Sequence, residues 1–455
     1  MGVDQNQTGE KLPDSHVFYR RLAHLHPLAE RGEGIYLWDK DGRRYIDGSG
    51  GAAVVNAGHG VAEIAQAMFE QAASVAYAHG TMFSTEAIED YSARLAALTP
   101  VETPRFYYLS SGSEAVETAL KFSRQVNLAR GKAARDVIIS RWGSYHGTTL
   151  GALAVTGKPK MRTPFAPLMR DHPHIPPPYC YRCPFGATYP SCDLACAQAL
   201  ETEILNQGKD RVMAFIAESV GGATLGAVVP PEDYWPRIAQ ICERYDLLLI
   251  VDEVMAGFGR TGRWFGIQHF GVEPDIITMG KGITSGYFPL SITAVRDSDV
   301  QTILDAHGDF AHGGTFSHHA VGASAAQATL DYLEQHDLVT AAANLGTYLG
   351  QKLKAELGEL PFVGDIRGLG MLWGVEFVAD RKTKDPISPE AQFSRRVGDL
   401  AFERGVIFYP GSGSVDGVRG DHLLIAPPFI ITESEIDVMV GLLREVVFEV
   451  WQEIK

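Results

Sequence analysis

Short runs of hydrophobic residues without polar alternation recur through the middle of the chain, and helical patterns separate them. The runs cover residues 106–109, 137–139, 212–217, 247–251, 276–279 and 290–295. Strands that are hydrophobic at every position are covered on both faces, which is typical of a parallel sheet packed between helices. The pattern therefore predicts an α/β domain with a mostly parallel sheet.

The two ends of the chain show shorter patterns. Residues 34–48 indicate two strands joined by a turn that contains Asp41-Gly42. After a long helical stretch at 320–357, strand-like runs follow at 372–378, 405–409 and 423–426. We expect the two ends to form one smaller α+β domain, with residues 1–65 as its N-terminal part, 66–335 as the large domain and 336–455 as its C-terminal part.

Composition narrows the class of protein. With 455 residues, 45% of them hydrophobic and 21% charged, the chain has the composition of a globular protein with a large core. A net charge of −15 without basic clusters disfavours a nucleic-acid partner. The polar N-terminus and the absence of a membrane-length hydrophobic run favour a cytoplasmic protein that does not bind membranes.

Polar residues lie at the ends of successive hydrophobic runs. They are Ser110, Ser111, Tyr145, Glu218, Asp252 and Lys281. In open parallel sheets, ligands bind beyond the carboxyl ends of the strands. We therefore expect these side chains to meet at one rim of the sheet.

Two of these residues carry a specific chemistry. Lys281 lies between Gly280 and Gly282, which leaves its amine open to an aldehyde, and Asp252 ends a buried strand, where a carboxylate can keep a pyridinium nitrogen protonated. These are the two fixed groups that pyridoxal phosphate needs. A lone lysine in a glycine turn is more often a plain surface residue, so the interpretation depends on the rest of the site.

Two further motifs fit that cofactor. The segment Ser111-Gly112-Ser113-Glu114 opens a helix, and the free N–H groups and dipole of such a helix start suit a phosphate. A plain helix cap is the alternative. Tyr145, in a glycine-flanked loop, can place its ring flat on a cofactor, although a core tyrosine is the simpler explanation.

Other patterns suggest different chemistry. Residues 257–262 spell G-x-G-x-x-G, but no amphipathic helix or distant acidic residue follows, so we reject nicotinamide binding. His312, His318 and His319 lack the spacing of metal ligands on a helix, and we predict no metal there.

Four cysteines are closely spaced, at Cys180, Cys183, Cys192 and Cys196, while Cys242 is expected in the core of a helix. The four could bind structural zinc or form two disulfides. Because the chain shows no signal peptide, we favour reduced thiols over either alternative.

Taken together, the motifs resemble those of class III pyridoxal-phosphate-dependent aminotransferases, the omega-transaminase family of fold type I. The resemblance spans about residues 36–435 and is carried by segments 111–114, 145–147, 252–254, 257–262, 280–282, 313–316 and 426–428. In this order and spacing they are specific for the cofactor and less specific for the reaction.

The resemblance implies roles for the cofactor-binding residues. Lys281 would carry the cofactor and later move the proton, and Asp252 would pair with the pyridine nitrogen. The phosphate would lie on Ser111, Gly112 and Ser113, the ring between Tyr145 and Val254, and Glu218 near Asp252. Thr315 would reach the phosphate in the neighbouring subunit, so a homodimer with shared sites is expected.

The implied activity is transfer of an amino group from a primary amine or omega-amino acid to a keto acid, pyruvate or 2-oxoglutarate, by a ping-pong mechanism. The same residues also serve an aminomutase, racemase, decarboxylase or phospholyase, so these remain alternatives. Residues at the implied substrate positions are Ala53, Met82, Phe83, Tyr145 and Arg419.

The chain departs from the family at substrate positions. Gly417 stands where amine transaminases usually carry the arginine that binds the keto-acid carboxylate, and Arg419 is the nearest arginine. Ala223 and Met255 replace a glutamate and a glutamine found in related enzymes. Ala53 replaces a bulky tryptophan, which predicts room for a larger donor.

Overall fold

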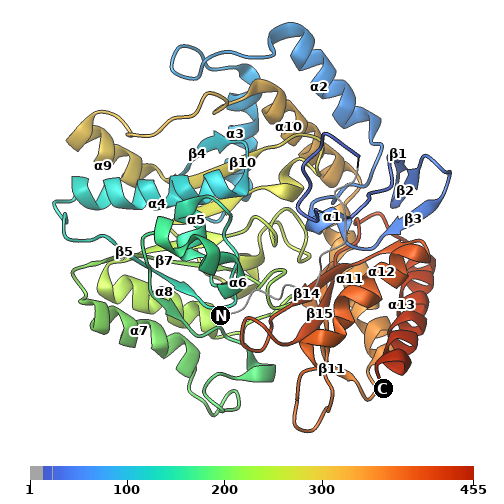
Figure 1. Ribbon diagram of the computed structural model, residues 1–455. Coiled ribbons are helices and arrows are strands. Elements are labelled where there is room, and N and C mark those ends of the chain that lie inside the picture. The colour runs from blue at the N-terminus through green and yellow to red at the C-terminus, as the bar shows by residue number, and fades with distance from the viewer. Residues whose placement is uncertain (1–13, 23) are drawn as a thin grey trace.

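The computed structural model describes residues 14–22 and 24–455, so most of the polar N-terminal stretch lies outside the described residues. Its centre is a seven-stranded sheet with strand order β4-β10-β9-β8-β7-β5-β6 (Figure 1). The strands are β4 (Pro104–Leu109), β5 (Val137–Arg141), β6 (His174–Ile175), β7 (Val212–Glu218), β8 (Leu248–Asp252), β9 (Ile276–Met279) and β10 (Ser291–Arg296). Only β10 runs antiparallel to its neighbours, so the predicted α/β fold with a mostly parallel sheet is confirmed.

The strands are hydrophobic at every position because both faces of the sheet are covered. Successive side chains of a strand point to opposite faces. In β8, Leu248 and Ile250 join the core cluster that includes helix α4 (Gly112–Ala129), whereas Leu249 and Val251 join the cluster that includes α8 (Tyr234–Tyr245). The sheet is thus the middle layer of three.

The other helices that accompany the seven-stranded sheet lie around it and beyond its edges (Figure 1). They are α2 (Ala62–Val75), α3 (Glu86–Leu98), α5 (Leu150–Val155), α6 (Pro159–Arg162), α7 (Ala195–Gln207), α9 (Asp297–His307) and α10 (Ala320–Gln335), with 3-10 turns η1 (Thr163–Leu168), η2 (Cys180–Arg182), η3 (Gly266–Phe270) and η4 (Lys281–Ile283).

Two four-stranded sheets lie outside the central one. The first is β1 (Ala29–Glu33), β2 (Tyr36–Asp39), β3 (Arg44–Asp47) and β13 (Val406–Ile407), and the second is β11 (Val363–Leu369), β12 (Leu372–Phe377), β15 (Asp421–Ile425) and β14 (Tyr409–Ser412). The parallel pairing of β3 with β13 joins the two ends of the chain. The exact domain boundaries remain a prediction.

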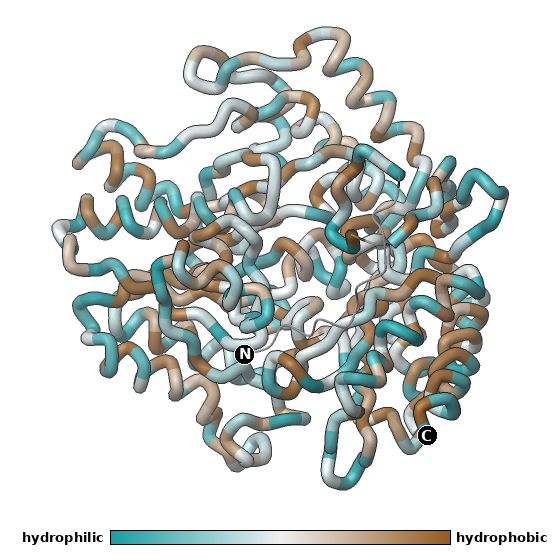
Figure 2. Tube along the Cα trace, viewed as in Figure 1, coloured by the Kyte–Doolittle hydropathy of each residue, from teal (hydrophilic) through white to brown (hydrophobic). Residues whose placement is uncertain are grey.

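The helices of the C-terminal part pack on the second sheet. They are α11 (Leu338–Leu357), α12 (Phe393–Glu403) and α13 (Glu433–Ile454), with the 3-10 turn η5 (Pro389–Ala391), while the short α1 (Gly50–Ala53) follows β3 near the N-terminus. One buried cluster contains Leu349, Val375, Val397 and Leu443 from these elements. Helix α13 alternates hydrophobic and hydrophilic residues along its length, as an amphipathic helix does (Figure 2).

Two local details differ from the sequence pattern. The helical stretch 320–357 is two helices, because Asp337 between α10 and α11 has a left-handed φ of 49° that ends the first. The predicted pair of strands at 34–48 gains a third partner, β1. The turn between β2 and β3 is held by the Asp39 carboxylate, which accepts hydrogen bonds from the N–H groups of Asp41 and Arg43.

Candidate active site

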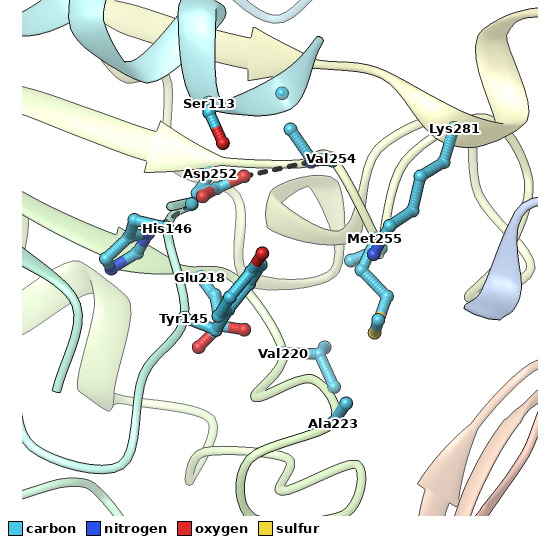
Figure 3. A pocket seen from close by; sticks show the side chains of 13 residues that line it. Ser113, Tyr145, His146, Glu218, Val220, Ala223, Asp252, Val254, Met255 and Lys281 are labelled. Carbon is cyan, nitrogen blue, oxygen red and sulfur yellow. Dashed lines mark hydrogen bonds and ion pairs between the residues drawn. The ribbon is translucent and has the colours of Figure 1, made fainter. Parts of the chain in front are cut away.

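The polar strand ends meet in one cavity of about 170 Å³, which we call the inner pocket. Its lining includes Ser113, Tyr145, Glu218, Asp252, Val254 and Lys281 (Figure 3). These residues come from the ends of β4, β5, β7, β8 and β9. The convergence expected from the order of hydrophobic runs is present for Tyr145, Glu218, Asp252 and Lys281, whereas Ser110 and Ser111 do not line the cavity.

Lys281 starts the η4 turn with a left-handed φ of 47°, a conformation that costs energy for a side chain other than glycine. Gly282 is needed for packing, since a Cβ there would lie 2.2 Å from Nδ2 of Asn56. Burial lowers the pKa of the Lys281 amine to about 8, and the charges of Asp252 and Glu218 only partly oppose this shift. A lysine with a lowered pKa in a cleft is a candidate nucleophile and base.

Asp252 is buried at the end of β8, and its side chain is held from two directions. Nδ1 of His146 lies 2.7 Å from Oδ2, and the N–H of Val254 donates to Oδ1 at 3.0 Å (Figure 3). His146 is itself buried, and its Nε2 has no hydrogen-bond partner among the described residues. These contacts fix the orientation of the carboxylate in the inner pocket.

The sequence analysis assigned no role to His146. Its place beside Tyr145 was the available signal, but the spacing of residues along the chain does not show that the imidazole turns toward Asp252.

Glu218 is buried at the end of β7, and burial raises the pKa of its carboxyl group. Oε1 accepts the N–H of Gly222 at 3.1 Å, while Oε2 has no partner among the described residues. Nη2 of Arg141 donates to the carbonyl of Glu218 at 2.6 Å and fixes the strand end.

The N-terminus of α4 forms one wall of the inner pocket. Ser111 caps the helix by accepting the N–H of Glu114, and Ser113 Oγ accepts the N–H of Thr148 at 3.0 Å. A Cβ at position 112 would lie 3.0 Å from Val254 Cγ1, so only glycine lets the helix start approach this wall closely. Backbone N–H groups and the dipole at this start suit a phosphate.

The donor set fits pyridoxal phosphate. The inner pocket offers an amine on Lys281, an oriented carboxylate on Asp252, an aromatic ring on Tyr145 opposite Val254, and a helix start for the phosphate. The cofactor is an electron sink for the carbon beside a bound amine nitrogen.

Other predicted residues lie apart from the inner pocket. Met82 and Phe83 are 75% and 70% exposed, and Thr315 is also exposed. Ala53 is only 1% exposed and packs with Val220 and Ala256 behind the pocket wall. Their substrate and phosphate roles remain predictions.

Arg419 lies outside the inner pocket as well. Its Nε donates to Oδ2 of Asp416 at 2.7 Å, and its side chain is half exposed. The guanidinium is therefore held within its own loop in this structure.

The remaining motifs have structural contacts. Arg260, within the G-x-G-x-x-G segment, is buried and donates to the carbonyl of Pro427 at 2.7 Å. His312 lies 2.9 Å from Thr118 Oγ1. All five cysteines are free thiols, and the described part of the chain holds no group of three or more histidine, cysteine or acidic residues arranged for a metal. No described helix has the length and hydrophobicity to span a bilayer.

A mostly parallel sheet that presents a buried lysine, an oriented carboxylate and a helix start at one rim defines a fold type I transferase. The chain belongs to the class III aminotransferases, whose family model matches residues 18–447, and it is an enzyme of that family.

Individual relatives agree with this assignment. The chain is 37% identical, over 90% of its length and 87% of the relative, to a diaminobutyrate–2-oxoglutarate transaminase of Halomonas elongata. It is 34% identical to a putrescine–pyruvate aminotransferase of Pseudomonas aeruginosa, covering 92% of this chain and 90% of that one. An (S)-enantioselective omega-transaminase from Thermomicrobium roseum superposes with a TM-score of 0.88 at 39% identity, with 93% of each chain covered.

Proposed function

We propose that the protein is a pyridoxal-phosphate-dependent transaminase that moves an amino group from a primary amine or omega-amino acid to a keto acid, pyruvate or 2-oxoglutarate, in a ping-pong cycle. The observation that carries the proposal is the Lys281 amine in one cavity with the Asp252 carboxylate, which His146 orients. The relatives from Halomonas elongata and Pseudomonas aeruginosa, whose names pair a diamine-type donor with each keto acid, support this substrate class.

The role of each residue in this reaction follows from its charge and its position in the inner pocket. Lys281 Nζ, with its lowered pKa, can lose its proton near neutral pH and then take a proton from the substrate carbon beside the nitrogen. Lys281 Nζ would then hold that proton within the inner pocket until it is returned. Asp252 would hold the ring nitrogen of the cofactor protonated, and Tyr145, which lines the same cavity, would lie against the ring.

We propose that the working form is a homodimer with shared sites. Thr315, Met82 and Phe83 are exposed in the single chain, and so is Phe316 beside Thr315. Large hydrophobic side chains exposed on the surface of a single chain are typical of a protein interface. The five free thiols support a reducing compartment such as the cytoplasm.

The test uses the holoenzyme in single half-reactions. An amine donor, added alone, should convert the yellow cofactor absorbance to that of the amino form in a stoichiometric amount, and pyruvate or 2-oxoglutarate should restore it. The Lys281→Ala variant, which lacks the reacting nitrogen, should show neither change at a comparable rate.

The same experiment separates the alternatives. A racemase, decarboxylase or phospholyase would turn over its substrate while the yellow absorbance persists, and an aminomutase would complete its turnover without any keto acid. Persistence of the absorbance with every donor in a broad amine panel would contradict the proposed transamination.

A further inference from the structure

A second cavity of about 350 Å³, which we call the side pocket, has Thr224 in its lining, directly after Ala223 of the inner pocket. Its lining includes Trp142, Lys158, Tyr179, Arg182, Thr224 and Gly417. A Cβ at position 417 would lie 3.0 Å from Pro159 Cγ, so the residue after Lys158 fills the space next to this glycine. The cationic residues in the lining of the side pocket are therefore Lys158, next to Pro159, and Arg182.

The charges of the side pocket do not balance. Its only acidic lining residue, among those that the structure describes, is Asp416, which is already paired with Arg419. Lys158 is half-buried and forms no salt bridge or side-chain hydrogen bond within residues 14–22 and 24–455. Burial, together with the charges of Arg20 and Lys160, lowers the pKa of its ammonium group.

Arg182 adds one further donor atom that is unpaired among the described residues, although its charge is paired with that of Glu376. Its Nε is bound by Glu376 at 2.5 Å, whereas its Nη2 is buried without an acceptor among the described residues. A buried donor without a partner costs free energy, and the cost is larger for a charged group. Two such groups in one cavity favour an anionic ligand that accepts from both.

The side pocket is close to the reaction centre. The N–H of Gly143 donates to the carbonyl of Gly157 at 2.8 Å, and the N–H of Gly157 donates to the carbonyl of Ser144 at 3.1 Å. Tyr145 and Lys158 directly follow these paired residues.

Two electrostatic links agree with this placement. The charge of Arg20 acts on both the Tyr145 phenol and the Lys158 ammonium. The charge of Lys158 also reaches His422, whose Nε2 lies 2.9 Å from the carbonyl of Ala223 in the inner pocket wall.

We infer that Lys158, assisted by Nη2 of Arg182, binds the carboxylate of the keto-acid acceptor in the side pocket. The inference rests on the proposed function and names the residue that recognises its acidic substrate. A carboxylate accepts two charged N–H donors at once, which removes both unsatisfied groups. The charge of Arg20, which acts on Lys158, adds attraction for an anion on a protein whose net charge is −15.

The experiment compares acceptors that differ in charge on the amino form of the holoenzyme. Pyruvate and 2-oxoglutarate carry the carboxylate, and propanal is an uncharged acceptor. We expect Lys158→Met to raise KM for both keto acids about 10- to 100-fold, the usual effect of losing a charged hydrogen bond, with a much smaller effect on kcat and on the propanal reaction. Lys158→Arg should restore most of the lost affinity.

Two controls make the result specific. Lys160→Met removes a neighbouring exposed lysine with the same charge and should change keto-acid KM less than about twofold, as surface charges usually contribute little. Binding of unreactive glutarate to the holoenzyme, measured by calorimetry, should weaken in Lys158→Met by the same factor as KM.

The outcomes separate this inference from the proposed function. Equal losses for keto acids and propanal, or identical Lys158→Met and Lys160→Met enzymes, would overturn the role of Lys158. Failure of the wild-type holoenzyme to react with any amine would instead overturn the transaminase proposal.

Discussion

The inner pocket and the side pocket differ in how their charges are arranged. In the inner pocket the Lys281 amine faces the carboxylates of Asp252 and Glu218, and the strand ends of the central sheet hold these groups. In the side pocket Lys158 and Nη2 of Arg182 lack acidic partners among the described residues, and loops form the walls. The chain thus provides counter-charges for Lys281 in the inner pocket, whereas in the side pocket Arg182 is paired with Glu376 and Lys158 has no counter-charge among the described residues.

Removing Lys281 should have the largest effect, because the inner pocket loses its amine and its base together. We expect Lys281→Ala to lower kcat on the order of 10⁴-fold, the upper range for loss of general acid–base catalysis. Steady-state rates with saturating donor and acceptor provide the measurement, and an unchanged circular dichroism spectrum provides the control for folding. A residual rate within about tenfold of the wild type would show that another group supplies the chemistry.

Replacing Asp252 should cause the second largest fall in kcat, since its carboxylate supplies the fixed negative charge of the inner pocket. Asp252→Asn keeps the shape and removes the charge, and we expect kcat to fall about 10²- to 10³-fold. Glu218→Gln is the matched control in the same cavity, because burial already raises the pKa of that carboxyl group and brings it nearer to the neutral form. Equal losses in the two variants would remove the special role of Asp252.

Replacing His146 should lower kcat less than replacing Asp252 does, because the imidazole acts through the Asp252 carboxylate. His146→Phe removes the 2.7 Å contact with Oδ2, and we expect kcat to fall about 10- to 100-fold, the range for a hydrogen bond to a charged group. In a double-mutant cycle the loss in His146→Phe should largely disappear when Asp252 is already asparagine. Additive losses would mean that the imidazole acts independently of the carboxylate.

The sequence predicted what depends on strand order and failed where side chains from distant segments meet. Lys281, Asp252 and Tyr145 were found because each follows a hydrophobic run, and a parallel sheet brings such positions to one rim. His146 and Lys158 were missed because their partners, Asp252 and the side pocket, are set by loop conformation. The helix break at Asp337 was also missed, since a single left-handed residue leaves the hydrophobic period almost unchanged.

The pH dependence of Lys281 tests the electrostatics of the inner pocket. Folding lowers the pKa of its amine from 10.5 to about 8, so between these values the folded protein carries the neutral amine while the unfolded chain carries the charged one. The rate of Lys281 acylation in cofactor-free protein should rise about tenfold per pH unit below pH 8 and level off above it. Mass spectrometry of the peptide containing Lys281 gives the rate.

The lowered pKa of Lys281 also determines how the free energy of unfolding changes with pH. The unfolded state binds more protons between about pH 8 and 10.5, so this group makes the free energy of unfolding rise with pH in that window. Urea-unfolded protein is the control for acylation, and its rate should keep rising toward pH 10.5. A folded-state rate that follows the unfolded curve would contradict the lowered pKa.

Ala53 should produce the smallest effect on the chemistry, because it lies behind the pocket wall rather than in it. Ala53→Trp adds bulk beside Val220 and Ala256 at a position with a left-handed φ of 58°. In this variant we expect kcat/KM to fall about tenfold more for bulky donors than for small ones. The free energy of unfolding should fall by about 1–3 kcal/mol because of overpacking. Donor series at fixed acceptor and chemical denaturation separate the two effects, because lost stability alone reduces the rates of all donors equally. Such an equal reduction would remove Ala53 from substrate selection and leave donor size to be set by the exposed residues Met82 and Phe83.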